Sequence, residues 1–428
     1  MALSYKALFF SAGLTTTGVK SLTGFGFQPK VVRITMNGRT DTVDASGLAN
    51  IRLSIGCAAT ATDRGVCAFS SLNAAAAADV GSRMAAGLVM ETDGAAAEIG
   101  FADFSAFVSD GVEINVTNAF TADFRLLVEC WGGTDITNVR GAVKFNWGDA
   151  TGNVTFGSFG FDPGADSYFF FWGAGHANAA LPTIEEDAYQ PCVGIARSAS
   201  PIQQGVCMYN HDDNSTTADV DEYTRGDECL ATMAQAGAAV TNRRATFVGS
   251  ASDGFTINVL EATAVQRHSF CMCIKGGSHH IGSLLTQTDT TTDIVESGFG
   301  FAPVGVSFFS ISQPEPAAGT AVSDGKLSIG CATSTTDEKC LSIASNNGAL
   351  NMEENTAIEH DAVYARITDT TGAIEGLMRM QSMPDSDGFT CRMDDADAAQ
   401  EFVIFSAHGN TPAAPSTTGI GWFGAGWF

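Results

Sequence analysis

Apolar and polar residues alternate in short runs along the chain, and turn residues separate the runs. Residues 51–57 (IRLSIGC) and 112–116 (VEINV) follow the two-residue period of a half-buried β-strand. Asp110-Gly111 precedes the second run, and Asp-Gly between alternating runs is a strong hairpin signal. Residues 74–90 are predicted to form a loop with some helical turns. The pattern predicts an all-β fold of short antiparallel strands, and a parallel α/β fold fits it poorly.

A Gly/Phe-rich segment, which we call the signature, occurs three times. Residues 24–29 read GFGFQP, residues 158–163 read SFGFDP and residues 298–303 read GFGFAP, with central glycines 134 and 140 residues apart. A Ser-Asp-Gly turn recurs after each signature, and its aspartates are 143 and 134 residues apart. Solenoid repeats are only about 20–50 residues long, so this period indicates a repeated domain. We expect the glycines to turn the backbone tightly and the phenylalanines to enter each core.

The repeat divides the chain into three modules, each predicted to be an antiparallel β-sandwich of jelly-roll type. The predicted boundaries are residues 1–136, 137–278 and 279–410, and residues 411–428 form a C-terminal tail. Three fused sandwiches of similar size could form a string or a pseudo-threefold unit.

The formal net charge of −25 limits the classes of partner. A field of that sign repels phosphate backbones and anionic headgroups, so we expect no nucleic-acid binding and no docking on anionic membranes. No apolar run reaches the roughly 18 residues of a membrane-spanning helix. The apolar segment near the N-terminus is too short for a secretory signal, so we expect neither membrane insertion nor export by a signal peptide.

Eleven cysteines are spread along the chain rather than arranged as a compact disulfide framework. Two modules carry cysteines on facing arms of a predicted hairpin: Cys57 with Cys67, and Cys331 with Cys340. A cross-strand disulfide is geometrically possible there, but two buried thiols are the favoured interpretation without an export signal. In the second module Cys192 is displaced relative to the hairpin glycine, which weakens the expectation that it bonds Cys207.

Two groups of residues resemble metal ligands. The densest oxygen cluster comprises His211, Asp212, Asp213, Asn214, Asp219, Asp221 and Glu222. Its spacing fits no EF-hand loop, so we interpret it as a solvated acidic loop. His279 and His280 are adjacent, and neighbours on a strand point to opposite faces, so they are poorly placed to share one ion. No metal site is predicted.

Motifs for catalysis are missing from the sequence. Gly-x-Ser-x-Gly, His-Glu-x-x-His and the P-loop pattern do not occur, and the signature lacks the third glycine and the helix of a dinucleotide site. The turn aspartates Asp110, Asp253 and Asp387 are assigned a structural role in tight hairpins. Carboxylates are numerous enough to leave a glycosidase pair open. We predict no catalytic residue, no cofactor and no enzymatic activity.

The tail is rich in aromatic residues. Its last seven residues hold four of them: Trp422, Phe423, Trp427 and Phe428. Such side chains are unfavourable in water, so they either fold back onto the third module or dock on a neighbouring subunit. We favour docking, and with it a homo-oligomer.

The modular pattern as a whole, from the Gly-x-Gly-Phe-x-Pro entry to the closing strand that ends in Gly-Gly, resembles virion proteins of tailed bacteriophages. The resemblance covers residues 23–409. The second module departs from it with Asp-Pro-Gly after the signature. The resemblance implies a role in assembly or host contact and supplies no functional residues.

We therefore expect a non-enzymatic phage structural protein, assembled in the host cytoplasm and located on the virion exterior, with capsid decoration as the favoured role. Its partners would be other capsid or tail proteins. The main alternative is a receptor-binding tail or fibre adhesin whose loops, such as residues 210–227, contact host surface glycans. A polysaccharide depolymerase is a third, less favoured class.

Overall fold

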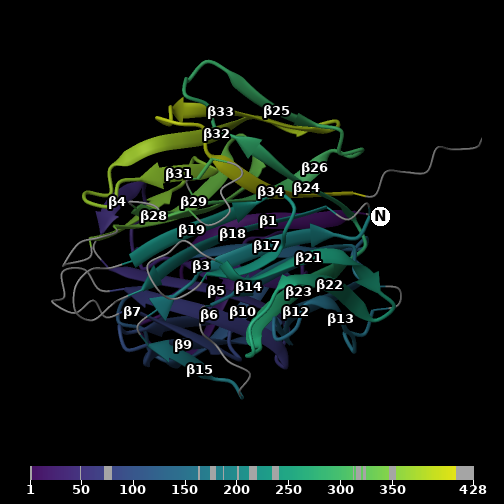
Figure 1. Ribbon diagram of the computed structural model, residues 1–428. Helices are drawn as coiled ribbons and strands as arrows, with labels where there is room; N and C mark the ends of the chain where they lie inside the picture. The colour runs from purple at the N-terminus through teal and green to yellow at the C-terminus, as the bar shows by residue number, and fades with distance from the viewer. Residues whose placement is uncertain are drawn as a thin grey trace, which may run out of the picture.

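The computed structural model describes residues 2–48, 50–71, 80–161, 164–173, 180–186, 188–199, 202–211, 219–233, 241–311, 313–314, 320–321, 324–346 and 353–410. These residues form 34 strands and no helix, which confirms the all-β prediction (Figure 1). The described part of the chain accordingly has no helix capable of crossing a membrane.

The strands form three pairs of sheets, each pair a β-sandwich. The first sandwich has a large sheet of β1 (Leu3–Ser11), β11 (Arg125–Gly133), β3 (Pro29–Met36), β5 (Ile51–Thr60), β6 (Asp63–Ser71) and β7 (Val80–Ala85), and a small sheet of β2 (Gly18–Thr23), β10 (Gly111–Asn118), β9 (Glu98–Val108) and β8 (Val89–Thr92). The second has a large sheet of β12 (Asn138–Trp147), β23 (Arg267–Lys275), β14 (Ser167–Trp172), β17 (Cys192–Arg197), β18 (Ile202–His211) and β19 (Asp219–Arg225), with β16 (Ala188–Tyr189) beside β18, and a small sheet of β13 (Gly152–Phe156), β22 (Gly254–Glu261), β21 (Thr241–Ala251) and β20 (Leu230–Met233). The third has a large sheet of β24 (Ser278–Leu285), β34 (Phe402–Gly409), β26 (Pro303–Ser310), β28 (Asp324–Ser334), β29 (Asp337–Asn346) and β30 (Glu354–Glu359), and a small sheet of β25 (Asp293–Ser297), β33 (Gly388–Asp395), β32 (Ile374–Asp385) and β31 (Tyr364–Ile367).

Each large sheet is completed by a strand from another sandwich. β4 (Ala45–Leu48) leaves the first sandwich and pairs with β30 of the third, where its purple ribbon lies beside green strands in Figure 1. β15 (Thr183–Glu186) leaves the second and pairs with β7 of the first. β27 (Thr320–Ala321) leaves the third and pairs with β19 of the second. Each sandwich therefore gives one strand to a second sandwich and receives one strand from the third. This cyclic exchange joins the three sandwiches in a closed pseudo-threefold ring.

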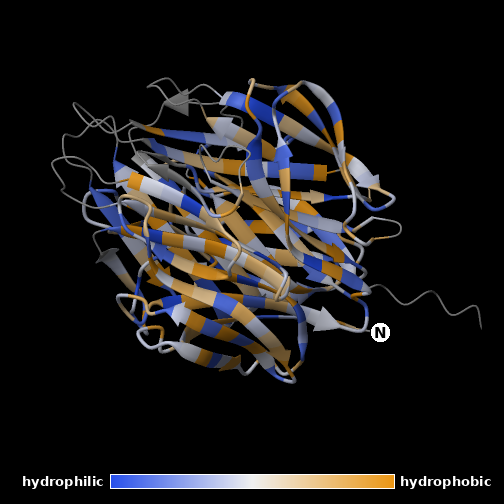
Figure 2. Ribbon diagram, turned by 90° about the horizontal axis from the view of Figure 1, so that it is seen from below, coloured by the Kyte–Doolittle hydropathy of each residue, from blue (hydrophilic) through white to orange (hydrophobic). Residues whose placement is uncertain are grey.

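The large sheets are buried on both faces. In β11, Val128 and Cys130 point into the first sandwich, whereas Leu127 and Trp131 belong to a core shared by all three large sheets. We call the line along which the three large sheets meet the axis. Figure 2 shows mostly apolar strands through the middle of the molecule. Each large sheet therefore separates its own sandwich core from the axial core.

This second buried face corrects two expectations. Residues 51–57 are not half-buried: apart from Arg52, every residue of that run is buried, because the face that alternation assigns to solvent is also packed. Within residues 74–90, the described segments are the strands β7 and β8 rather than a loop with helical turns. Because the large sheets are packed on both faces, a two-residue period does not mark a solvent face in their strands.

The three signatures fold alike around the turn aspartates. Asp110 accepts hydrogen bonds from Gly24 N at 2.9 Å and Gly26 N at 2.5 Å. Asp253 does the same for Ser158 N and Gly160 N, and Asp387 for Gly298 N and Gly300 N. All six donors have positive φ angles, which explains the glycines. The first phenylalanine of each signature is buried in its sandwich, as predicted: Phe25, Phe159 and Phe299.

Candidate functional site

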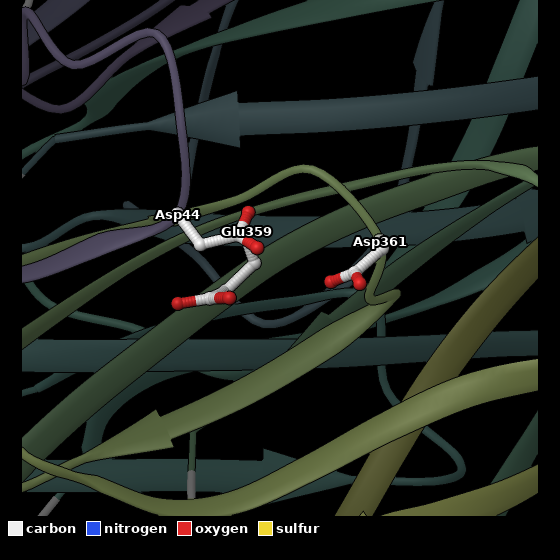
Figure 3. A group of neighbouring side chains, drawn as sticks. All are labelled: Asp44, Glu359 and Asp361. Carbon is white, nitrogen blue, oxygen red and sulfur yellow. The ribbon is translucent and has the colours of Figure 1, made fainter.

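Three carboxylates meet where β4 joins the third sandwich (Figure 3). Asp44 directly precedes β4, Glu359 ends β30, and Asp361 lies in the turn that follows. One oxygen from each lies within 4.8 Å of one oxygen from each of the others. The pairing of Ala45 with Ile358 brings the two strands together at this point. We call Asp44, Glu359 and Asp361 the junction carboxylates.

The junction carboxylates differ in burial and in partners. The Asp44 and Asp361 side chains are about half exposed, whereas Glu359 is 7% exposed. Asp361 pairs with Arg379 Nη2 at 3.0 Å, and Asp44 Oδ1 accepts from His360 N at 2.6 Å. The Glu359 carboxylate makes no hydrogen bond or ion pair with any residue that the structure describes. Burial, and then the charges of Asp44 and Asp361, raise the pKa of Glu359 to about 7.

A cleft of about 310 Å³ lies between the second and third sandwiches. Its lining includes Asp166, Arg197, Ser278, His279, Phe299 and Phe301. Arg197 Nη1 donates to the carbonyl of His279 at 3.2 Å, and its Nε is buried without a hydrogen-bond partner. No carboxylate among the described residues pairs with Arg197, and burial lowers its pKa. Among the described residues Arg197 therefore has no ion-pair partner, and the Asp166 carboxylate of the same lining accepts a hydrogen bond from Gly276 N instead.

The axis contains a buried ion pair. Arg33 Nη2 lies 2.5 Å from Glu129 Oε2, and both side chains are almost fully buried. Glu129 Oε1 also accepts from Tyr5 and from Ser307, each at 2.7 Å. The Arg33 guanidinium lies 4.4 Å from the ring centroid of Phe169. These contacts join all three sandwiches.

A second polar group lies on the axis around Glu354, which is fully buried. Its Oε1 accepts from Ser71 of the first sandwich at 2.7 Å, from Asn210 of the second at 3.4 Å and from Ser345 of the third at 2.9 Å. No cation neutralises this carboxyl among the described residues, and burial raises its pKa to about 8. Glu354 is thus held by one residue from each sandwich.

The cysteines confirm one expectation and correct another. Cys57, Cys67, Cys331 and Cys340 are buried free thiols, as favoured. The expectation for the second module was wrong, because a disulfide joins Cys192 to Cys207. In the β17–β18 pairing these two residues are directly opposite each other, whereas Cys57 faces Gly65. The displacement of Cys192 in the sequence is what brings it opposite Cys207.

The predicted acidic loop is corrected in part. Residues 212–218 lie outside the described residues. Asp221 and Glu222 are fully buried in β19, so they are not part of a solvated loop. Glu222 accepts from Lys326 N and from Gln313 Nε2, and burial raises its pKa well above the usual range. This carboxylate thus fixes the third sandwich against the second.

The adjacent histidines point to opposite faces, as expected. His279 Nε2 donates to the carbonyl of Gly276, and its Nδ1 lies 3.0 Å from Nδ1 of His408. His280 stacks on Phe299 at 4.1 Å between ring centroids. Burial lowers the pKa of both histidines.

The remaining sequence predictions fare differently. The turn aspartates have the structural role assigned to them, as caps of the signatures. The docking residues Trp422, Phe423, Trp427 and Phe428 lie outside the described residues, so docking stays a prediction. The junction carboxylates were not predicted, because only the strand exchange brings Asp44 to Glu359. The sequence matches no protein-family model and no curated protein, and the structure matches no solved structure.

Proposed function

We propose that this chain is a non-enzymatic structural protein on the exterior of a bacteriophage particle, with capsid decoration as its role. The observation that carries the proposal is the closed ring of three sandwiches, in which every large sheet is completed by a strand from another. A single chain thereby forms a threefold-shaped body. Such a body fits a position where three copies of a shell protein meet, because its pseudo-threefold arrangement matches the threefold arrangement of those copies.

The proposal also accounts for the axis. Three identical subunits would be related by true symmetry, which places equal charges together at the axis. Fusion into one chain instead lets Arg33 of the first sandwich face the rings of Phe169 of the second and Phe309 of the third. Linking also means that once one sandwich binds a shell, the other two are held near that shell at high effective concentration. Each single contact with the shell can therefore be weak.

The test is the location of the protein on purified particles. Mass spectrometry of gradient-purified virions, followed by antibody labelling in electron micrographs, should find the protein on the head. Its absence from particles would overturn the proposal, and labelling of the tail tip would favour the adhesin. A chain that lacks residues 411–428 should keep its melting temperature and lose attachment if the tail docks on the particle.

The second candidate is a receptor-binding adhesin for host surface glycans. The cleft beside Arg197 favours this role, because an unpaired guanidinium suits the carboxylate of an acidic sugar. The segment at residues 210–227 supports it less than expected, since Asn210, Asp221 and Glu222 are buried. Binding of the isolated protein to host cells, lost in Arg197→Gln and retained in Arg379→Gln, would support the adhesin. Equal binding by both variants would exclude the cleft as its site.

A further inference from the structure

We propose that the junction carboxylates Asp44, Glu359 and Asp361 bind one calcium ion, which fastens β4 of the first sandwich to the third sandwich. The three oxygens converge from two sandwiches (Figure 3). Glu359 is more than nine-tenths buried, and one of its carboxylate oxygens lies within 4.8 Å of an oxygen of each of the other two, without a hydrogen bond or ion pair to any described residue. A buried carboxylate needs a compensating partner, and a cation would supply it.

The fold itself does not require acidic residues here. Glu359 pairs with Cys340, and the equivalent register positions in the other two sandwiches pair Ala85 with Val66 and Arg225 with Gly205. An alanine and an arginine therefore occupy the positions in the other two sandwiches that are equivalent to Glu359. Of the three junctions, only the one made by β4 has gathered three carboxylates among the described residues.

The flexible coordination geometry of calcium favours it over magnesium at this site. Ligands on opposite sides of a calcium ion are about 4.8 Å apart, since each lies roughly 2.3–2.6 Å from the ion. The three oxygens lie within 4.8 Å of one another, which accommodates an ion of either kind. Magnesium needs a near-ideal octahedron at about 2.0–2.1 Å, so its opposite ligands lie closer together. The half-exposed Asp44 and Asp361 leave room for water to complete a coordination shell of calcium.

Two side chains that contact the junction carboxylates set the calcium affinity of the site. Arg379 Nη2 holds Asp361 at 3.0 Å, and His360 Nδ1 lies 3.2 Å from Asp44 Oδ1. Both compete with an ion for these carboxylates, while Glu359 stays available. We therefore expect binding in the range of extracellular calcium modules, with Kd of about 10⁻⁴–10⁻³ M. The inference is independent of the virion role, because ring closure by a cation would suit any function.

The test uses the full-length chain, dialysed against EDTA and then titrated with CaCl₂ or MgCl₂ in a calorimeter and in thermal melts. We expect one calcium ion per chain, a higher melting temperature with calcium, and a smaller rise with magnesium. Glu359→Gln should weaken calcium binding at least tenfold and abolish the shift in melting temperature. Arg379→Gln should tighten binding several-fold, because it frees Asp361.

The control is Asp149→Asn, which removes an exposed carboxylate of the second sandwich and should leave calcium binding unchanged. The control matters because a chain with a net charge of −25 attracts cations diffusely. Should Glu359→Gln fail to fold, Asp361→Asn provides the same comparison at a half-exposed position. Absence of binding at 5 mM calcium would overturn the proposal, as would equal affinity in the wild-type chain and in the junction variants.

Discussion

Inside the three sandwiches, equivalent positions make the same interactions, whereas at the axis equivalent positions carry different residues. Asp110, Asp253 and Asp387 each cap a signature by accepting hydrogen bonds from the same two backbone N–H groups. At the axis, the positions opposite Cys57, Ile195 and Cys331 are occupied by Arg33, Phe169 and Ser307. These three differ in charge and size, and they complement one another. The interiors therefore preserve the repeated fold, and the axis fixes the order of the modules.

The same contrast holds further along the axis. Ser71, Asn210 and Ser345 occupy equivalent positions and pair across the sheet with Val80, Val220 and Glu354. Only the third sandwich supplies a carboxyl, and the other two supply donors to it. A ring made of three copies of one module would lose this complementarity. The three sandwiches thus share one fold but differ in the residues through which they contact one another.

The largest effect should come from breaking the axial ion pair. Glu129→Ala leaves the Arg33 guanidinium buried without its carboxylate and removes the acceptor of Tyr5 and Ser307. We expect a loss of about 3–5 kcal/mol in the free energy of unfolding, measured by urea denaturation. Arg33 pairs with Glu129 across the sheet, and the equivalent pair in the second sandwich is the apolar Phe169 with Met272. The double variant Arg33→Met/Glu129→Met copies that apolar pair and should be more stable than Glu129→Ala. An equal loss of unfolding free energy in both variants would show that the unpaired charge of Arg33 is not the cause of the destabilisation.

The second prediction concerns Glu354 and pH. Its pKa is raised to about 8, so between its ordinary value near 4.5 and pH 8 the folded chain keeps a proton that the unfolded chain has lost. The stability contributed by this group is therefore full at low pH and falls as pH rises through that window, by up to about 1.4 kcal/mol per unit. Glu354→Gln should flatten the pH profile of the melting temperature and be more stable than wild type at pH 8.

A matched control for this profile is Glu338→Gln. Burial also raises the pKa of Glu338 to about 8, but this residue bonds Met380 N within the third sandwich and does not lie on the axis. Both variants should flatten the profile, and only Glu354→Gln should change contacts between sandwiches. A wild-type profile that stays level from pH 5 to pH 8 would contradict both assignments.

The sequence was sufficient for the features that are local or repeated. The signature, the Ser-Asp-Gly turn and the strand class follow from residues close together, and the fold confirms the all-β prediction. The strand exchange was not predictable, because β4 and β27 are short and their sequences contain no pattern that indicates which distant strand they pair with. Arg33 and Glu129 look like solvent-facing residues of half-buried strands, and only the packing of three large sheets buries them. The junction carboxylates depend on the same exchange.

The third prediction tests whether the interiors are really equivalent. Replacing a turn aspartate by alanine leaves two or three signature N–H groups without their acceptor. Each of Asp110→Ala, Asp253→Ala and Asp387→Ala should therefore cost about 1–3 kcal/mol of unfolding free energy. The three losses should agree within about 1 kcal/mol, with Asp253→Ala the largest because Phe161 N also donates to it. A loss confined to one module would contradict the equivalence.

The smallest predicted effect is a gain in stability at the position where the three signatures share a positive φ but one of them has a residue other than glycine. Ser158 has φ +68° where the other two modules have Gly24 and Gly298, also at positive φ. A non-glycine residue in this region costs about 1–2 kcal/mol, and glycine loses about 0.5–1 kcal/mol in chain entropy. Ser158→Gly keeps the N–H that bonds Asp253 and should raise the unfolding free energy by about 0.5 kcal/mol. The reverse change, Gly298→Ser, should lower it by a similar amount, and melts of the two variants should shift in opposite directions from wild type if the modules share one signature geometry.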